Sequence, residues 1–250
     1  MLKKDYLFAQ PDAVCISPTI ESVQLVGNRP SQFDTPLLIE TVLITIVATL
    51  VIKLLAQGSP FRWTWLLSPG ILVAAGTIPT MIKKRKLPDI GFSTGQVLSA
   101  LKIIGWTSII ILPPVFCGLW LLKLYGFQLP LQAVIPKNQE WIQLILYQFM
   151  YVAVAEEVFF RGYVQNNILR LRTTIMPSKR RLQPWTSIVL SAAVFAVAHV
   201  IVHGTITSVL TFLPGLIFGW LFIRTKSLLA PILFHGLSNT CYFVMLATLT

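Results

Sequence analysis

Two adjacent glutamates, Glu156 and Glu157, stand inside a long apolar stretch that begins near Trp141. A carboxylate in the middle of a bilayer costs roughly 2.5–3.5 kcal/mol by insertion scales, and two neighbouring carboxylates also repel each other. Core packing gives no reason to accept that cost. We therefore take the pair as the centre of a functional site and ask which other polar groups can reach it.

All three histidines of the chain lie in or at the ends of later apolar stretches. His203 follows His199 by four residues, and Asn239 follows His235 by four, so each pair is expected on one helix face. A single histidine there could simply hydrogen-bond across helices. Several such groups together with two glutamates all need partners in hydrocarbon, and one shared polar site meets that need. His203, at a helix end, is interpreted as an interfacial residue.

The spacing around the glutamates distinguishes one from the other. Arg161 lies four residues after Glu157, and an acid on the N-terminal side of a base is the favourable order for a helical ion pair. Glu156 lies about 100° away around the same helix. We expect Arg161 to hold Glu157, while Glu156 faces a cavity. The plainer alternative is that the Glu–Arg pair only locks a helix interface.

Composition places these residues in a membrane protein. Of the 250 residues, 55% are hydrophobic and 12% are charged, about half the charged share of a soluble domain. The pattern predicts an all-α, polytopic transmembrane bundle of about seven to eight helices, because several apolar segments approach the ~20 residues that span a bilayer. The segments are 37–56, 61–82, 97–125, 141–165, 185–203, 205–223 and 228–249.

The expected organisation is a polar N-terminal tail over 1–36 and a single transmembrane domain over 37–250. Within that domain, residues 37–125 are interpreted as scaffold. The polar groups that could do chemistry are concentrated in a core over 141–245.

The positive charge is interpreted as a topology signal. The net charge is +11, from 20 basic and 9 acidic residues, and the basic residues lie mostly between apolar segments, as at 83–86 and 170–181. No basic face with interleaved aromatics appears, so nucleic acid is not expected as a partner. The positive-inside rule predicts a cell-membrane protein with a cytoplasmic N-terminus, an external C-terminus and a site open to the cytoplasm. Nothing in the sequence indicates an oligomeric state.

The polar residues fall into three motifs in a fixed order. They are E-E-V-F-F-R at 156–161, F-A-V-A-H at 195–199 and H-G-L-S-N at 235–239. These match the patterns E-E-x-x-x-R, F-x-x-x-H and H-x-x-x-[N/D]. With them, the region from about 88 to 245 resembles the CPBP intramembrane protease family, which includes the type II CAAX prenyl endopeptidases.

This resemblance implies a glutamic endopeptidase that cleaves a peptide bond of a membrane-associated or prenylated substrate within the bilayer. Glu156 would be the general base that activates a water, and His199 would help to position that water. His235 and Asn239 would stabilise the oxyanion. Arg161 would have an orienting role, holding the second glutamate of the motif and the motif helix.

A metal is the main alternative within this chemistry. Glu156, His199 and His235 could hold Zn²⁺ with an open position for water. There is no H-E-x-x-H motif, and a glutamate–water mechanism needs no metal. We therefore expect no cofactor.

Two other function classes stay open on the sequence. One is an ion-coupled transporter that uses the Glu/His cluster as a relay, and the other is a non-proteolytic adaptor with the protease fold. A hydrolase predicts that Glu156→Gln and Asn239→Ala both abolish cleavage. A transporter predicts that Asn239→Ala is tolerated better, and an adaptor predicts a cellular phenotype that survives Glu156→Gln.

Overall fold

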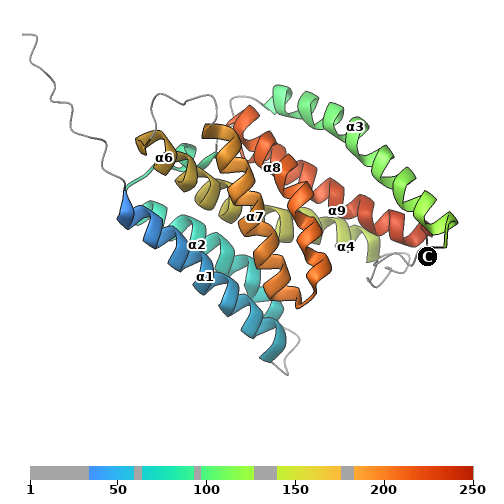
Figure 1. The fold of residues 1–250 in the computed structure, drawn as a ribbon, viewed down its shortest axis with the longest axis horizontal. Helices are drawn as coiled ribbons and strands as arrows, with labels where there is room; N and C mark the ends of the chain where they lie inside the picture. The colour runs from blue at the N-terminus through green and yellow to red at the C-terminus, as the bar shows by residue number, and fades with distance from the viewer. Residues whose placement is uncertain (1–33, 59–63, 93–96, 127–139, 176–182, 250) are drawn as a thin grey trace, which may run out of the picture. The chain divides into compact units, whose positions relative to one another are not determined.

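Every regular element in the described part of the chain is helical. Apolar segments of this length form helices because a helix satisfies its own backbone N–H and C=O groups without water. The structure, a computed structural model, describes residues 34–58, 64–92, 97–126, 140–175 and 183–249 (Figure 1). The tail predicted over 1–36 lies outside these ranges except for its last three residues.

The first part of the chain forms three helices, α1 (Thr35–Gly58), α2 (Ser68–Ile82) and α3 (Val97–Leu124). The motif region is one continuous helix, made of α4 (Glu140–Leu146), η3 (Tyr147–Ala153), α5 (Val154–Glu157), η4 (Val158–Gln165) and α6 (Asn166–Ile175). It is followed by α7 (Gln183–His203), η6 (Ile206–Thr211), α8 (Phe212–Thr225) and α9 (Leu229–Leu249). With the central stretch counted once, the described residues form seven helices, which confirms the predicted bundle.

Six of the described helical stretches are long and apolar enough to cross a membrane, and the chain is an integral membrane protein. The exception is α2, whose 15 residues reach about 22 Å, short of the ~30 Å hydrocarbon core. The predicted segment 61–82 is longer than this helix because Pro69 stands in its first turn, where proline is favoured. Because Lys83, just after α2, pairs with Glu40 near the start of α1, α2 returns the chain to the side on which α1 begins, and the external C-terminus stays a prediction.

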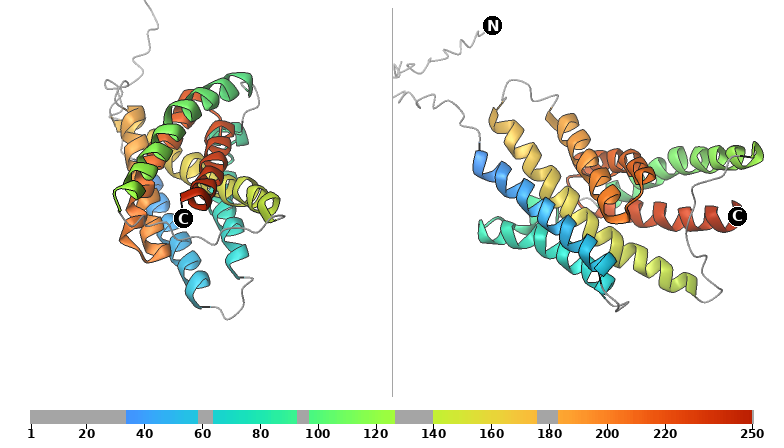
Figure 2. Two further views of the ribbon diagram at one scale, coloured as in Figure 1. Left: turned by 90° about the vertical axis from the view of Figure 1, so that its right-hand side faces the viewer. Right: turned by 60° about the horizontal axis from the view of Figure 1, so that its bottom comes forward.

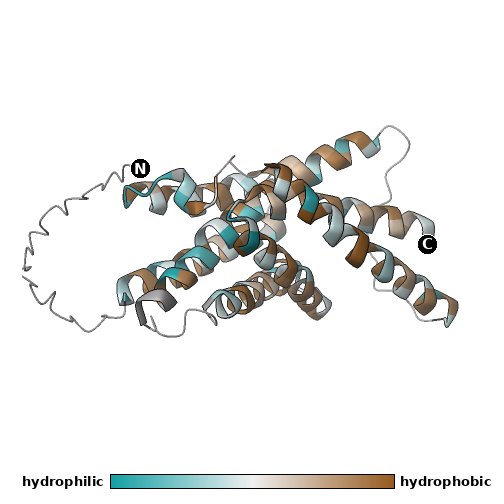
Figure 3. Cartoon of the chain, turned by 90° about the horizontal axis from the view of Figure 1, so that it is seen from above, coloured by the Kyte–Doolittle hydropathy of each residue, from teal (hydrophilic) through white to brown (hydrophobic). Residues whose placement is uncertain are grey.

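The central helix, Glu140–Ile175, crosses the middle of the described unit (Figure 2). Helices α1 and α2 pack on its second half, α7 joins them there, and α9 packs on η3. Helix α3 lies alongside α9 (Figures 1 and 2). Hydrophobic residues run along most helices in Figure 3, and on α3 Trp106 is 67% exposed, as suits a lipid-facing surface.

Two π-helical stretches, η3 and η4, flank the four residues of α5 that carry both glutamates. A π-bulge adds one residue to a helical turn and so changes which side chains share a face. Such bulges are frequent at functional sites. The helix is thus irregular on both sides of Glu156 and Glu157.

Close approach of α8 depends on two glycines. A Cβ at Gly215 would lie 3.2 Å from the Cβ of Ala192 on α7, and a Cβ at Gly219 would lie 3.0 Å from Gln165 Oε1 on the central helix. Because no side chain intervenes, Gln165 Nε2 donates a hydrogen bond to the Gly219 carbonyl at 3.0 Å. Small residues therefore let α8 contact both neighbours through its backbone.

A second polar cluster, separate from Glu156 and Glu157, connects α1 and α2 to the central helix. Lys83 Nζ lies 2.5 Å from Glu40 Oε2, and the Tyr163 hydroxyl donates to Glu40 Oε1 at 3.1 Å. Asn167 Nδ2 donates to Thr41 Oγ1, also at 3.1 Å. These contacts fix the scaffold helices against the helix that carries the motif.

Candidate active site

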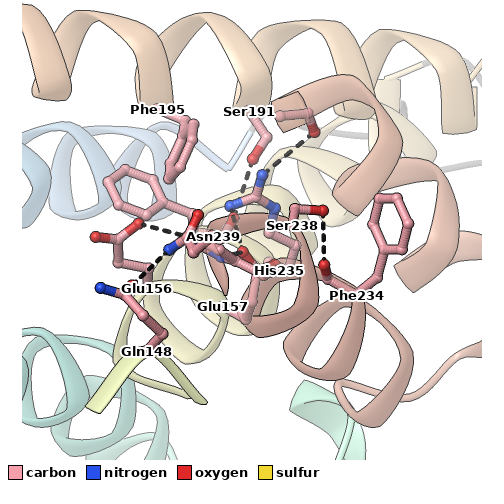
Figure 4. Close-up of polar contacts among 12 residues, drawn as sticks. Gln148, Glu156, Glu157, Ser191, Phe195, Phe234, His235, Ser238 and Asn239 are labelled. Atoms are coloured by element: carbon pink, nitrogen blue, oxygen red, sulfur yellow. Dashed lines mark hydrogen bonds and ion pairs between the residues drawn. The ribbon is translucent and has the colours of Figure 1, made fainter. Parts of the chain in front are cut away.

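The structure brings the three motifs together at one place. The polar residues come from α5, η4, α7 and α9, and most are drawn in Figure 4. His199 is near the end of α7, whereas His235 is near the start of α9. The two helices run at an angle to each other (Figures 1 and 2), so residues at different heights along them can both reach α5.

Glu157 is the fully buried carboxylate of the pair. Its Oε1 lies 3.1 Å from Arg161 Nη1, so the ion pair expected from the spacing is present. The same oxygen lies 2.8 Å from His235 Nδ1, a contact that the sequence did not predict. An ionised carboxylate only accepts hydrogen bonds, so His235 Nδ1 is the donor. In the neutral ring, His235 Nε2 then carries a lone pair.

Arg161 is fully buried between aromatic rings. Its guanidinium carbon lies 4.6 Å from the Phe195 ring centroid and 5.1 Å from that of Phe218. Its Nη2 donates to the Gly215 carbonyl at 3.2 Å. Ring faces attract a cation most strongly where water is excluded. Arg161 thus connects the central helix to α7 and α8 while it neutralises Glu157.

Glu156 is the outer carboxylate, with a side chain 18% exposed. Its Oε2 lies 3.8 Å from Nε2 of His199 and 3.8 Å from Nε2 of His235. These distances are too long for direct hydrogen bonds. Within the described residues, this buried oxygen has no hydrogen-bond partner. A water molecule can bridge polar atoms at such a distance, so the gap between Glu156 Oε2 and the histidine nitrogens suits a bridging water.

The orientation of His199 follows from its backbone contact. Its Nδ1 lies 2.9 Å from the Phe195 carbonyl oxygen. A carbonyl can only accept, so Nδ1 carries the proton and Nε2 is an acceptor in the neutral ring. The two histidines therefore both present acceptor nitrogens to Glu156. A water between Glu156 and His199 could donate one O–H to each.

Asn239 makes its side-chain contact to a residue that the motifs do not include. Its Nδ2 donates to Gln148 Oε1 at 2.9 Å (Figure 4). Gln148 belongs to η3 and is only 7% exposed. Sequence reasoning missed it, although an amide within an apolar stretch was a usable signal. Ordinary α-helical spacing puts Gln148 about 80° from Glu156, and so off its face.

A cavity of about 730 Å³ adjoins these groups. Its polar wall consists of Gln148, Glu156, His199, His203, His235 and Asn239, together with several hydroxyl groups. Apolar side chains from α1, α2, α3, α7, α8 and α9 form most of the remaining wall. An apolar pocket with a few convergent polar groups is typical of ligand-binding and active sites.

In the ranges that the structure describes, no three His, Cys, Asp or Glu side chains are arranged to hold a metal ion. The zinc set of Glu156, His199 and His235 stays an alternative that a cleavage assay with EDTA and Zn²⁺ decides.

Residues 138–241 match the family model described as type II CAAX prenyl endopeptidase Rce1-like. No curated protein and no solved structure matches the chain. The match confirms the resemblance found in the three motifs, and it begins at 138 where the sequence suggested about 88.

Proposed function

Because residues 138–241 are a domain of the Rce1-like type II CAAX prenyl endopeptidase family, we propose that the chain is an intramembrane endopeptidase in which Glu156 activates a water. Family membership implies peptidase activity on a protein substrate. The observation that carries the proposal is the unbonded Oε2 of Glu156, which faces two histidine nitrogens at the wall of a largely apolar cavity.

The first step is addition of water to the peptide carbonyl. The water donates one O–H to Glu156 Oε2 and the other to His199 Nε2, two acceptors that lie 3.8 Å apart. Glu156 takes its proton as the water oxygen bonds to the carbonyl carbon. The C=O π electrons move to the carbonyl oxygen, which becomes the oxyanion of a tetrahedral intermediate. An N–H of Asn239, whose amide is oriented by Gln148, stabilises that charge.

The second step breaks the peptide bond. The oxyanion electrons re-form C=O, and the C–N bond electrons leave with the nitrogen. The nitrogen receives the proton that Glu156 had accepted, so Glu156 returns to its ionised form. The products are a carboxylic acid and an amine, and every proton comes from the one water.

His235 contributes through its fixed orientation. Glu157 holds its Nδ1, and the Phe218 ring stacks on it at 4.5 Å between centroids and 15° between planes. The oxyanion role implied by the family resemblance needs a proton on Nε2. The protonated ring carries that proton and can stabilise the oxyanion, whereas in the neutral ring Nε2 is an acceptor that positions the water beside Glu156.

The substrate we propose is a membrane-associated or prenylated peptide. The apolar wall of the cavity suits a lipid chain or apolar side chains, and its polar end suits the scissile bond. From the distribution of Lys and Arg we further propose that the N-terminus is cytoplasmic and that the site opens to the cytoplasm.

The test compares purified wild type, Glu156→Gln and the control Glu140→Gln, an exposed glutamate at the start of the same helix. Quenched peptides, with and without a prenyl group, are offered in detergent with EDTA. Wild type and the control should cleave the peptides, and the cleavage rate of Glu156→Gln should be about 10²–10⁴-fold lower, which is the usual contribution of a general base. Full activity in Glu156→Gln would contradict the proposal. Activity lost in EDTA and restored by Zn²⁺ would replace the water mechanism with a metal-dependent one.

A further inference from the structure

An oxyanion in the proposed site needs N–H donors, and the two motif histidines do not supply them in their neutral forms. His199 uses its N–H on the Phe195 carbonyl, and His235 uses its own on Glu157. Asn239 is one donor on the cavity wall. A single neutral donor is a weak arrangement for a charge that develops in a water-poor site.

Gln148 carries the second carboxamide of the cavity wall. Its Oε1 is occupied by the hydrogen bond from Asn239 at 2.9 Å, so the position of its amide nitrogen is also fixed. The two side chains are joined in Figure 4, beside Glu156. The Nε2 of Gln148 therefore offers N–H groups at the same wall of the cavity as Glu156 and Asn239.

The π-helical stretch η3 explains how Gln148 comes to share a face with Glu156. Eight residues separate the two, which on an α-helix is about 2.2 turns. A π-bulge accommodates one extra residue, so the separation corresponds to seven α-helical residues, or about 1.9 turns. That brings the two side chains to within about 20° of each other around the helix.

We propose that Gln148 is a second oxyanion donor, whose Nε2–H binds the developing charge beside the Nδ2–H of Asn239. The inference rests on the proposed peptidase function. Loss of one oxyanion donor typically lowers kcat by about 10²–10³-fold. Substrate binding in the ground state does not use that donor, so KM should change little.

The experiment measures kcat, KM and inhibition by a peptide aldehyde, whose hydrate resembles the tetrahedral intermediate. The main variant is Gln148→Met, and the matched control is Gln143→Met, an exposed glutamine on the same helix. Gln148→Met should lower kcat by about 100-fold with KM within about threefold, and weaken aldehyde inhibition by a similar factor. Gln148→Glu keeps an acceptor for Asn239 but lacks the amide N–H groups, so its kcat should fall by at least the same factor. This variant replaces Gln148→Met in the test if Gln148→Met does not fold.

A double variant separates a donor from a positioning residue. If Gln148 binds the oxyanion itself, Asn239→Ala/Gln148→Met should be about 10- to 100-fold slower than Asn239→Ala alone. Equal rates would mean that Gln148 acts only through Asn239, and they would overturn the inference. A wild-type kcat in Gln148→Met would also overturn the inference about Gln148, but it would leave the proposed peptidase function intact. A wild type that cleaves no peptide would overturn both.

Discussion

Replacing Arg161 by methionine tests whether the buried ion pair organises the site. Both partners are fully buried, so Arg161→Met leaves the Glu157 charge without its cation. Removing one partner of a buried pair costs about 3–5 kcal/mol, whereas an exposed pair is worth about 0–1 kcal/mol. The hydrogen bond to the Gly215 carbonyl and the contacts with two aromatic rings are lost as well. We therefore expect a loss near the upper end of the first range.

The assay is thermal unfolding of purified protein in detergent. A loss of 3–5 kcal/mol corresponds to roughly 6–20 °C in Tm for a domain of this size. The control is Lys83→Met, which breaks the pair with Glu40, whose side chains are 33% and 27% exposed. That variant should shift Tm by only a few degrees, since the pair it breaks is close to the surface and is worth about 1 kcal/mol or less.

A double variant completes the cycle. Glu157→Gln/Arg161→Met removes both charges at once, and replacement of a whole buried pair by neutral residues is often close to neutral. It should therefore recover much of the stability lost in Arg161→Met, although His235 loses its charged acceptor. The reasoning is refuted if Arg161→Met stays within about 1 kcal/mol of wild type, or if the double variant is less stable than the single one.

Three further expectations follow from the same contacts. Glu156→Gln should keep or slightly raise Tm while activity is lost, because Glu156 Oε2 has no hydrogen-bond partner in the described chain; a fall of several degrees would show a structural role. His199→Asn keeps an amide donor near the Phe195 carbonyl but removes the outer acceptor, so it should fold normally and lower kcat by about 10²-fold or more; unchanged kcat would remove His199 from the mechanism. Gly215→Ala should destabilise by about 1–3 kcal/mol through crowding, because the new Cβ would lie 3.2 Å from Ala192 Cβ. Gly118→Ala, with nothing within 4 Å, is the control and should not lower Tm.

The convergence of the motifs could be predicted from the sequence because the cost of isolated polar groups in hydrocarbon leaves few alternatives. Glu156 Oε2 lies 3.8 Å from Nε2 of His199 and 3.8 Å from Nε2 of His235. The pairing of Glu157 with Arg161 followed from helical spacing. The contact of Glu157 with His235 did not, because it depends on the angle at which α9 approaches α5, and no local pattern encodes that angle.

Other features escaped prediction for identifiable reasons. Gln148 was missed because a π-bulge cannot be recognised in an apolar stretch, and regular spacing turns this residue away from Glu156. The predicted segment 61–82 is longer than α2, because hydropathy does not show that the 3-10 turn Thr64–Leu67 ends and the α-helix begins at Ser68. The functional roles of the site residues stay predictions until variants are assayed.

The π-helical stretch before Glu156 also determines which changes in chain length this helix can accept. By the helical count given above, Gln148 stands where the seventh residue before Glu156 would stand in a regular α-helix. Removing one of the residues between Phe149 and Ala153 would therefore leave a regular helix with Gln148 still on the face of Glu156. Removing a second residue would turn Gln148 by about 100° away from Glu156 and from its contact with Asn239. A single-codon deletion here should thus be tolerated better than a deletion of two codons, and a chimaera that borrows the N-terminal helices of a relative should be joined before Tyr147.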